Sequence, residues 1–280
     1  MDRLSLLAPA KLNRFLHITG RREDGYHLLQ SIFQFLDYGD EVHLCRRDDG
    51  QITRSSYLEG VPAEQDLVVR AAQALQRHSG TALGVDITVD KKLPMGGGLG
   101  GGSSDAASVL LGLNALWQLD CSLDELAELG LALGADVPVF VRGRSCWAEG
   151  VGEQITPIQI DEPWFVVLAP SVSINTGKLF SHPALTRDCP IRKIRGLETG
   201  AQVDDLSNVF EPLVRREYPP VDEAMRFLEA FSTARLTGTG ACVFSVFDSQ
   251  SEAQRVFEQR PSDLQGFVAK GVNVSPAHSK

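Results

Sequence analysis

The sequence predicts a mixed α/β (α+β) protein of two domains, and three observations support this expectation. Strand-like and helix-like segments alternate along its 280 residues, of which 43% are hydrophobic. A glycine-rich stretch joins a strand-like run directly to a long apolar helix-like run. The polar run Asp161-Glu162-Pro163 then interrupts the pattern. We therefore expect one domain over residues 1–160 and a second over residues 161–280, which suits a chain of this length.

Composition excludes several classes of function. A net charge of −9 and a pI near 5.2 argue against broad binding to nucleic acids or anionic membranes. Five scattered cysteines without a CxxC pair indicate neither a disulfide framework nor a zinc site. No apolar run approaches the ~20 residues of a membrane span, and the first residues are too short for a signal peptide. We expect a cytoplasmic protein, monomeric or weakly dimeric, without nucleic-acid or membrane partners.

The first half of the chain is predicted to begin with a strand over residues 4–16, broken by a polar turn that contains Lys11 and Asn13. A lone lysine at such a place is more often solvated than functional. A charged turn at residues 21–25 precedes Tyr26 and His27, which could simply pack against the apolar run that follows.

The remaining elements follow from periodicity and from turn residues. Predicted strands cover residues 42–45, 85–89, 155–160, 164–169 and 267–274, and a glycine-containing turn within residues 236–247 leads into a further strand. Predicted helices cover residues 65–78, 104–117, 123–133, 208–216, 223–231 and 251–259. Polar loops are expected at residues 46–56 and 181–205, and a glycine-rich turn region at residues 142–152. The spacing of Ser122 and Glu125 predicts a capping box at the start of the third helix.

Between Gly96 and Gly102, six of seven residues are glycine. Glycine permits positive φ and close approach to a ligand, and the N–H groups that open the next helix attract anions. We interpret this stretch as a phosphate-binding loop. A flexible linker is the alternative, but a linker separates folded units rather than joining a strand to a helix. The stretch lacks the Lys-Ser/Thr pair of a P-loop, and no acidic residue follows where a dinucleotide-binding fold needs one.

Charged residues near the loop have both structural and functional interpretations. Lys91 and Lys92 could meet a nucleotide or be a solvated strand end, while Asp105 could favour the dipole of its own helix. Asp136, among apolar neighbours and two residues before Pro138, could be an N-cap.

Several segments resemble the superfamily of galactokinase, homoserine kinase, mevalonate kinase and phosphomevalonate kinase (GHMP kinases). The glycine loop is similar to the central ATP-binding motif of that superfamily, and residues 9–13 and 238–242 resemble its other two motifs. Residues 24–27 and 134–138 are similar to the members that phosphorylate a cytidine-diphosphate-linked alcohol in the non-mevalonate isoprenoid pathway. The resemblance implies a two-domain fold with ATP and substrate in the cleft between domains.

The resemblance also implies roles for individual residues. Asp136 would be the base that accepts the proton of the substrate's 2-hydroxyl, and Lys11 would orient that hydroxyl and favour the alkoxide. Tyr26 and Phe180 would stack on the cytosine and His27 would hydrogen-bond to it, with Asn13 and Thr176 near other polar groups of the substrate. Residues expected to contact ATP are Lys92, Pro94, Met95, Gly96, Gly97, Gly98, Leu99, Gly100, Gly101, Gly102, Ser103, Ser104 and Asp105.

The expected partners are ATP with Mg²⁺ and the acceptor 4-diphosphocytidyl-2-C-methyl-D-erythritol. No residues are assigned to the metal, which phosphoryl transfer requires to neutralise charge. The sequence departs from the family pattern at Asp66, where asparagine is common, and at Thr237, where serine is usual. Two other functions stay open: a kinase of mevalonate or homoserine, which Tyr26 and His27 disfavour, and a regulatory nucleotide-binding protein, which would need neither Lys11 nor Asp136.

Overall fold

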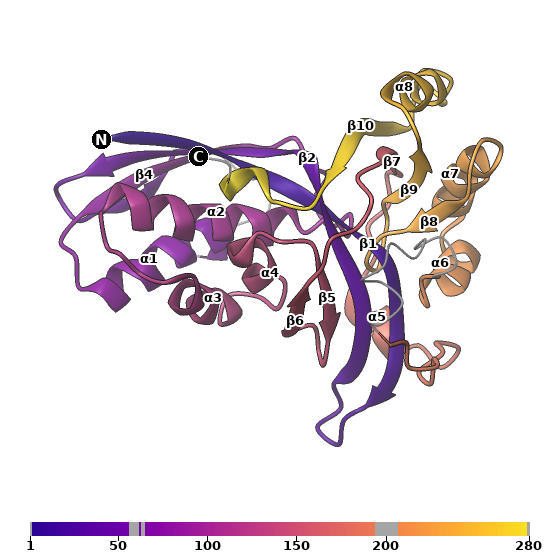
Figure 1. Cartoon of the computed structure of the whole chain (residues 1–280), viewed down its shortest axis with the longest axis horizontal. Coiled ribbons are helices and arrows are strands. Elements are labelled where there is room, and N and C mark those ends of the chain that lie inside the picture. The colour runs from indigo at the N-terminus through magenta and orange to yellow at the C-terminus, as the bar shows by residue number, and fades with distance from the viewer. Residues whose placement is uncertain (1, 56–61, 63–64, 194–206, 279–280) are drawn as a thin grey trace.

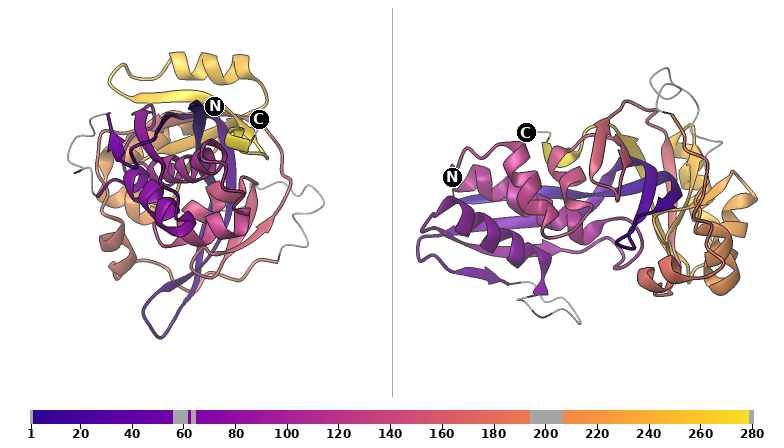
Figure 2. Two further views of the ribbon diagram at one scale, coloured as in Figure 1. Left: turned by 90° about the vertical axis from the view of Figure 1, so that its left-hand side faces the viewer. Right: turned by 90° about the horizontal axis from the view of Figure 1, so that it is seen from below.

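The structure is a computed structural model that describes residues 2–55, 62, 65–193 and 207–278. Its strands join one 10-stranded sheet with the order β3-β4-β2-β10-β7-β9-β8, in which β1 and β5 also pair with β2, and β6 pairs with β5. Helices α1 to α4 cover one end of this sheet, and α5 to α8 lie at the other end (Figure 1). The two ends of the chain lie near each other beside the first group (Figures 1 and 2).

The strands are β1 (Arg3–Arg21), β2 (His27–Arg47), β3 (Ile52–Arg54), β4 (Gly84–Asp90), β5 (Cys146–Glu149), β6 (Gln154–Pro157), β7 (Trp164–Ala169), β8 (Ala234–Leu236), β9 (Val243–Phe247) and β10 (Gln265–Val272). The helices are α1 (Leu67–Ser79), α2 (Gly101–Leu116), α3 (Leu123–Leu131), α4 (Val137–Arg142), α5 (Thr176–Ser181), α6 (Glu211–Glu217), α7 (Pro219–Glu229) and α8 (Gln250–Glu258), followed by a short 3-10 helix (Pro276–His278).

The long antiparallel pair of β1 and β2 runs through both halves of the molecule (Figure 1). The predicted polar turn inside residues 4–16 is wrong, because β1 is one strand. Its register with β2 instead shifts between Pro9 and Lys11, between Asn13 and Phe15, and between Ile18 and Gly20. Such bulges redirect side chains without ending a strand. The polar residues that suggested a turn therefore mark irregular pairing.

Other predictions need correction where tertiary pairing overrides local pattern. The strand predicted at residues 42–45 is part of the much longer β2, and β3 lies inside the predicted loop 46–56. The predicted turn region 142–152 contains β5, which pairs with β2, and the next strand ends at Pro157. Residues 137–142 form a short helix where only a turn was expected.

Most of the longer periodic segments are confirmed. Helix α1 and strand β4 match their predictions within two residues, and the capping box of Ser122 and Glu125 is present at α3. The predicted strand 164–169 and the later helices are also present, although α2 begins at Gly101, three residues earlier than predicted. The predicted polar loop 181–205 continues beyond residue 193 into residues 194–206, which lie outside the described residues.

Hydrophobic side chains of the described residues form two large clusters and two smaller ones. The first packs α1 to α4 against β1, β2 and β4, and the second packs α5 to α8 against the strands of the other half. The larger of the two smaller clusters contains Leu99 of the glycine loop together with Leu12 of β1 and Phe244 of β9. Leu99 is buried, which is worth about 1.5–3 kcal/mol for such a side chain. This contact fixes the loop where the two halves meet.

Within the described residues, no helix is both long enough and apolar enough to cross a membrane.

Candidate active site

The glycine loop adopts a backbone that only glycine accommodates well. Gly96, Gly98 and Gly100 have φ values of 69°, 79° and 73°, alternating with residues of ordinary φ. A Cβ atom at Gly98 would lie 2.3 Å from the carbonyl oxygen of Thr237. At Gly100 it would lie 2.7 Å from Cζ of Phe140. Alternating backbone conformations of this kind form a concave nest of N–H groups.

Three carbonyl groups of the loop are held by the rest of the protein. The Lys11 N–H donates to Leu99 O over 3.0 Å, and the Cys242 N–H donates to Gly97 O over 3.1 Å. The Thr237 hydroxyl donates to Gly98 O over 3.3 Å. By contrast, none of the N–H groups of residues 96–103 has a protein acceptor within the described part of the chain. Donors are therefore left for an anion at the N-terminus of α2, as phosphate binding requires.

Two cavities meet at the loop. One, of about 380 Å³, is lined by the whole stretch from Pro94 to Ser103, together with Lys91, Asp105 and Asp66. The other, of about 440 Å³, lies across the loop and is lined by Lys11, Asn13, Asp136, Thr176 and Phe180 among others. Three loop glycines, at positions 96, 98 and 100, line both cavities. An anion in the nest would thus face both spaces.

Strand β1 positions Lys11 and Asn13 side by side. Residues two apart in a strand share a face, and the Lys11 Nζ donates to Asn13 Oδ1 over 2.6 Å. The Asn13 amide then donates to the Ser31 hydroxyl over 2.7 Å, and Ser31 donates to Phe15 O over 2.7 Å. Both Lys11 and Asn13 are buried. This chain of hydrogen bonds fixes the ammonium group in the second cavity.

Asp136 occupies the N-cap position of α4, but its side chain caps nothing. It lies 3.6 Å from Lys11 Nζ, as measured to Oδ2, and its side chain is 37% exposed while that of Lys11 is only 5% exposed. The N-cap position expected for Asp136 is thus confirmed, but its side chain makes no capping hydrogen bond. Burial lowers the pKa of Lys11, while the Asp136 carboxylate opposes that shift. The pair joins a buried ammonium to a carboxylate that reaches the cavity.

A third cavity, of about 540 Å³, continues from the second and is lined by Tyr26, His27 and Phe180. Phe180 lines both of these cavities. The His27 and Phe180 rings lie with centroids 5.1 Å apart and an interplanar angle of 36°. Tyr26 is 65% exposed at the turn between β1 and β2. The structure thus brings together the three aromatic side chains that the sequence singled out.

Arg187 is a site residue that sequence reasoning missed. Its Nε donates to His27 Nε2 over 3.1 Å, and its Nη2 donates to the carbonyls of Phe180 and His182, both over 2.8 Å. Arg187 lies in a segment of mixed polar residues, so nothing in the local pattern distinguishes it. Burial lowers the pKa of His27, and the positive charges of Arg187 and Arg21 lower it further.

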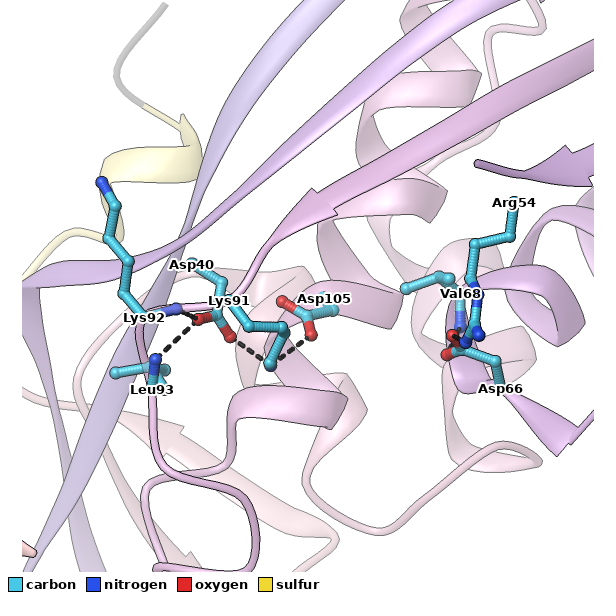
Figure 3. Close-up of polar contacts among 8 residues, drawn as sticks. All are labelled: Asp40, Arg54, Asp66, Val68, Lys91, Lys92, Leu93 and Asp105. Atoms are coloured by element: carbon cyan, nitrogen blue, oxygen red, sulfur yellow. Dashed lines mark hydrogen bonds and ion pairs between the residues drawn. The ribbon is translucent and has the colours of Figure 1, made fainter. Parts of the chain in front are cut away.

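On the other side of the loop, Lys91 rather than Lys92 faces the cavity. Lys91 Nζ pairs with Asp105 at 2.8 Å and with Asp40, whose other oxygen accepts the N–H groups of Lys92 and Leu93 (Figure 3). The Lys92 side chain points away from this group (Figure 3). It pairs instead with Glu41 at 2.5 Å. The geometry gives Lys92 no contact with either cavity beside the loop.

The two departures from the family pattern have structural explanations. Asp66 Oδ1 caps α1 by accepting the Val68 N–H over 3.1 Å, and Oδ2 pairs with Arg54 (Figure 3). An asparagine could cap the helix in the same way, but the carboxylate also neutralises Arg54. The hydroxyl of Thr237 accepts the Asn13 N–H over 3.1 Å, so threonine retains the polar function of serine.

Known proteins are similar to this chain over nearly its whole length. Residues 66–144 match the model for the GHMP kinases N terminal domain, and residues 191–264 match the model for the GHMP kinases C terminal domain. A 4-diphosphocytidyl-2-C-methyl-D-erythritol kinase of Pseudomonas aeruginosa strain LESB58 is 56% identical over 278 residues, which cover 99% of this chain and 97% of the relative. The chain belongs to the 4-diphosphocytidyl-2-C-methyl-D-erythritol kinases, a family of GHMP kinases. It is therefore an ATP-dependent kinase.

Further relatives have the same name or share the fold. One of the same name from Pseudomonas putida strain KT2440 is 55% identical and covers 100% of this chain and 96% of its own. A crystal structure of 4-(cytidine 5'-diphospho)-2C-methyl-D-erythritol kinase superposes with a TM-score of 0.83 at 30% identity, covering 96% of this chain and 99% of the other. Homoserine kinase from Cytophaga hutchinsonii shares the fold, with a TM-score of 0.72 at 17% identity and coverage of 98% and 96%. The two-domain GHMP fold expected from the sequence is confirmed.

The kinase offers few candidate metal ligands beside the loop. In the first cavity the side-chain oxygens are those of Gln65, Asp66, Ser103 and Asp105, and Asp66 is already engaged by Arg54. Asp105 Oδ1 is buried without a hydrogen-bond partner among the described residues. Glu41, His43 and Asp90 form a partly exposed group that could hold an ion, but none of them lines either cavity that meets the loop.

Proposed function

We propose that the protein transfers the γ-phosphate of ATP to the 2-hydroxyl of 4-diphosphocytidyl-2-C-methyl-D-erythritol, in non-mevalonate isoprenoid precursor synthesis. One observation carries this proposal. The glycine nest lies between a cavity suited to ATP and a cavity that holds the Lys11–Asp136 pair and leads on to Tyr26, His27 and Phe180. In this arrangement the phosphate donor, the reacting groups and an aromatic base site would follow one another in space. The names of the close relatives support the same substrate.

In this proposal Asp136 is the catalytic base. Its carboxylate accepts the hydroxyl proton as the hydroxyl oxygen bonds to the γ-phosphorus and the bond to the β–γ bridging oxygen breaks, which releases ADP. Lys11 orients the hydroxyl and stabilises the oxygen as its negative charge grows, because its ammonium is buried and held by Asn13. The nest at residues 96–103 binds the phosphates, with the positive end of the α2 dipole behind it.

The acceptor is held along the remaining cavities. Tyr26 and Phe180 would stack on the cytosine and His27 would hydrogen-bond to its edge, which the aromatic lining of the third cavity supports. Asn13 and Thr176 would contact the polar groups between the base and the reacting hydroxyl. The Thr176 hydroxyl already lies 2.9 Å from that of Thr239 in the second cavity.

ATP would contact Lys91, Asp105 and the loop from Pro94 to Ser104, with Lys92 outside the immediate contact. Mg²⁺ would be coordinated mainly by phosphate oxygens, with Ser103 and Asp105 as the protein oxygens within reach of that cavity. The metal supplies charge neutralisation on the triphosphate.

We further propose that residues 1–160 bind ATP and that residues 161–280 complete the acceptor side. We also propose that the enzyme is a cytoplasmic monomer or weak homodimer.

A three-substrate assay tests the function. The purified protein is incubated with ATP, Mg²⁺ and either 4-diphosphocytidyl-2-C-methyl-D-erythritol, mevalonate or homoserine, and ADP release is followed. We expect ADP only with the cytidine-bearing alcohol, and ³¹P NMR should show the new phosphate ester at its 2-hydroxyl. ADP with mevalonate or homoserine instead would make the protein a related small-alcohol kinase. ATP binding without ADP release from any of the three would favour a regulatory protein.

A further inference from the structure

Arg187 connects two residues that line the third cavity, His27 and Phe180. Its guanidinium donates from Nε to the His27 ring at the start of β2, and from Nη2 to the Phe180 carbonyl in α5. Further bonds reach the carbonyls of His182 and Leu185, the latter over 3.0 Å from Nη1. One side chain thus ties the β1–β2 pair to the end of α5, which lies beside it (Figure 1).

The contact with His27 determines which ring nitrogen carries the proton. A guanidinium has only donors and stays charged at every physiological pH, so His27 Nε2 must accept through its lone pair. In the neutral imidazole the proton then lies on Nδ1. A positive charge 3.1 Å from the ring also disfavours the doubly protonated form. His27 therefore presents an N–H donor at Nδ1, which has no hydrogen-bond partner within the described part of the chain.

We propose that Arg187 is a positioning residue for base recognition, which holds His27 as an Nδ1–H donor and fixes the Phe180 ring next to it. This inference rests on the proposed function, because it assigns the donor to the base of a cytidine-bearing acceptor. Cytosine has an unprotonated ring nitrogen, N3, on its pairing edge, whereas uracil carries a proton there at neutral pH. A fixed donor therefore selects cytosine over uracil, since two donors facing each other leave both unpaired.

The first test compares variants on two acceptors. Arg187→Met should raise the KM for the cytidine acceptor about 10- to 100-fold, the usual effect of losing a charge-assisted hydrogen bond, with kcat changed less than about threefold. Its preference over the uridine counterpart should fall in the same proportion, while the KM for ATP stays constant. Arg187→Lys retains one donor and should restore part of the preference.

Arg260→Met is the matched control. Arg260 also holds main-chain carbonyls, those of Leu264 and Phe257, at the end of a helix far along the chain from His27. Its loss should leave the preference unchanged. Combining Arg187→Met with His27→Ala should reduce the preference no further than His27→Ala alone, because Arg187 acts through the ring. An unchanged preference in Arg187→Met, or additive losses in the double variant, would overturn the proposal.

A second measurement needs neither a variant nor a substrate. Long-range ¹H–¹⁵N correlation spectra of the wild-type imidazole groups distinguish a protonated from an unprotonated nitrogen. We expect the His27 signals of a neutral ring with the proton on Nδ1, and a proton on Nε2 would refute the proposal. The two failures are distinguishable: a protein that does not turn over the cytidine acceptor fails the proposed function, whereas a wrong tautomer or an unaffected preference in an active enzyme fails only this inference.

Discussion

Two groups of lysine and carboxylate side chains flank the glycine loop, and they differ in how their charges are compensated. On the proposed acceptor side, Lys11 is buried and faces one carboxylate, Asp136, at 3.6 Å. On the proposed ATP side, Lys91 lies between Asp40 and Asp105 (Figure 3). Burial lowers the pKa of Lys11, whereas for Lys91 the two carboxylates outweigh burial and raise it.

This difference indicates that the Lys11 group serves the reaction, whereas the Lys91 group serves the structure of the loop. A single, partly exposed carboxylate that lies 3.6 Å from a fixed ammonium leaves Asp136 free to accept a proton from a ligand. Asp40 is fully buried and also accepts the N–H groups of residues 92 and 93, the chain that leads into the loop. The first group should therefore control rate, and the second should control whether the loop is held in place.

Asp136→Asn should give the largest change. The amide keeps the shape of the side chain but cannot accept the proton, so kcat should fall about 10²- to 10⁴-fold, the usual contribution of a general base. The melting temperature should change little, because the side chain makes no cap and is 37% exposed. Steady-state kinetics and thermal melting measure both effects. Asp124→Asn, an exposed carboxylate paired with Arg142, is the control and should retain wild-type kcat.

Lys11→Met should give the second-largest change. We expect kcat to fall about 10²- to 10³-fold, as when one donor that stabilises a transition state is removed. The KM for ATP should stay close to that of the wild type, since Lys11 does not line the ATP-side cavity. If kcat stayed within threefold of wild type, the acceptor-side pair would have no part in the reaction and the comparison would fail.

Much of this arrangement is predictable from the sequence, because it is formed by residues that belong to recognisable motifs. Lys11, Asp136 and the glycine loop are recognisable by type and spacing, and the loop must be glycine where a Cβ would clash. The bulges of β1, by contrast, depend on pairing with β2, and polar residues inside a strand look locally like a turn. Arg187 and Asp40 act through partners more than 50 residues away in sequence or through main-chain groups. No local pattern reports such contacts.

Lys91→Met should chiefly reduce stability. It leaves Asp40 and Asp105 close together and buried without their shared cation, and breaking a buried ion pair in this way costs about 3–5 kcal/mol. Lys11→Met should cost less, because Asp136 remains in contact with solvent. Urea unfolding of both variants gives their free energies of unfolding. If both variants lost the same free energy, the assignment of a structural role to the Lys91 group alone would be contradicted.

The last expected effect is a pH dependence of stability that Asp105 contributes. Burial raises the pKa of Asp105 to about 7 from a usual value of 3.8, with Lys91 opposing the shift. Between these pH values the folded state binds more protons than the unfolded state, so this group's contribution to the free energy of unfolding falls as pH rises. Asp105→Asn removes the titration, and the variant should therefore gain stability relative to wild type from pH 4 to pH 7, by at most about 1.4 kcal/mol per pH unit. Urea unfolding across that range measures the difference in the free energy of unfolding. If this free energy changed with pH in parallel for the two proteins, Lys91 would compensate the buried charge of Asp105 fully. Asp136, by contrast, does not fully compensate the burial of Lys11.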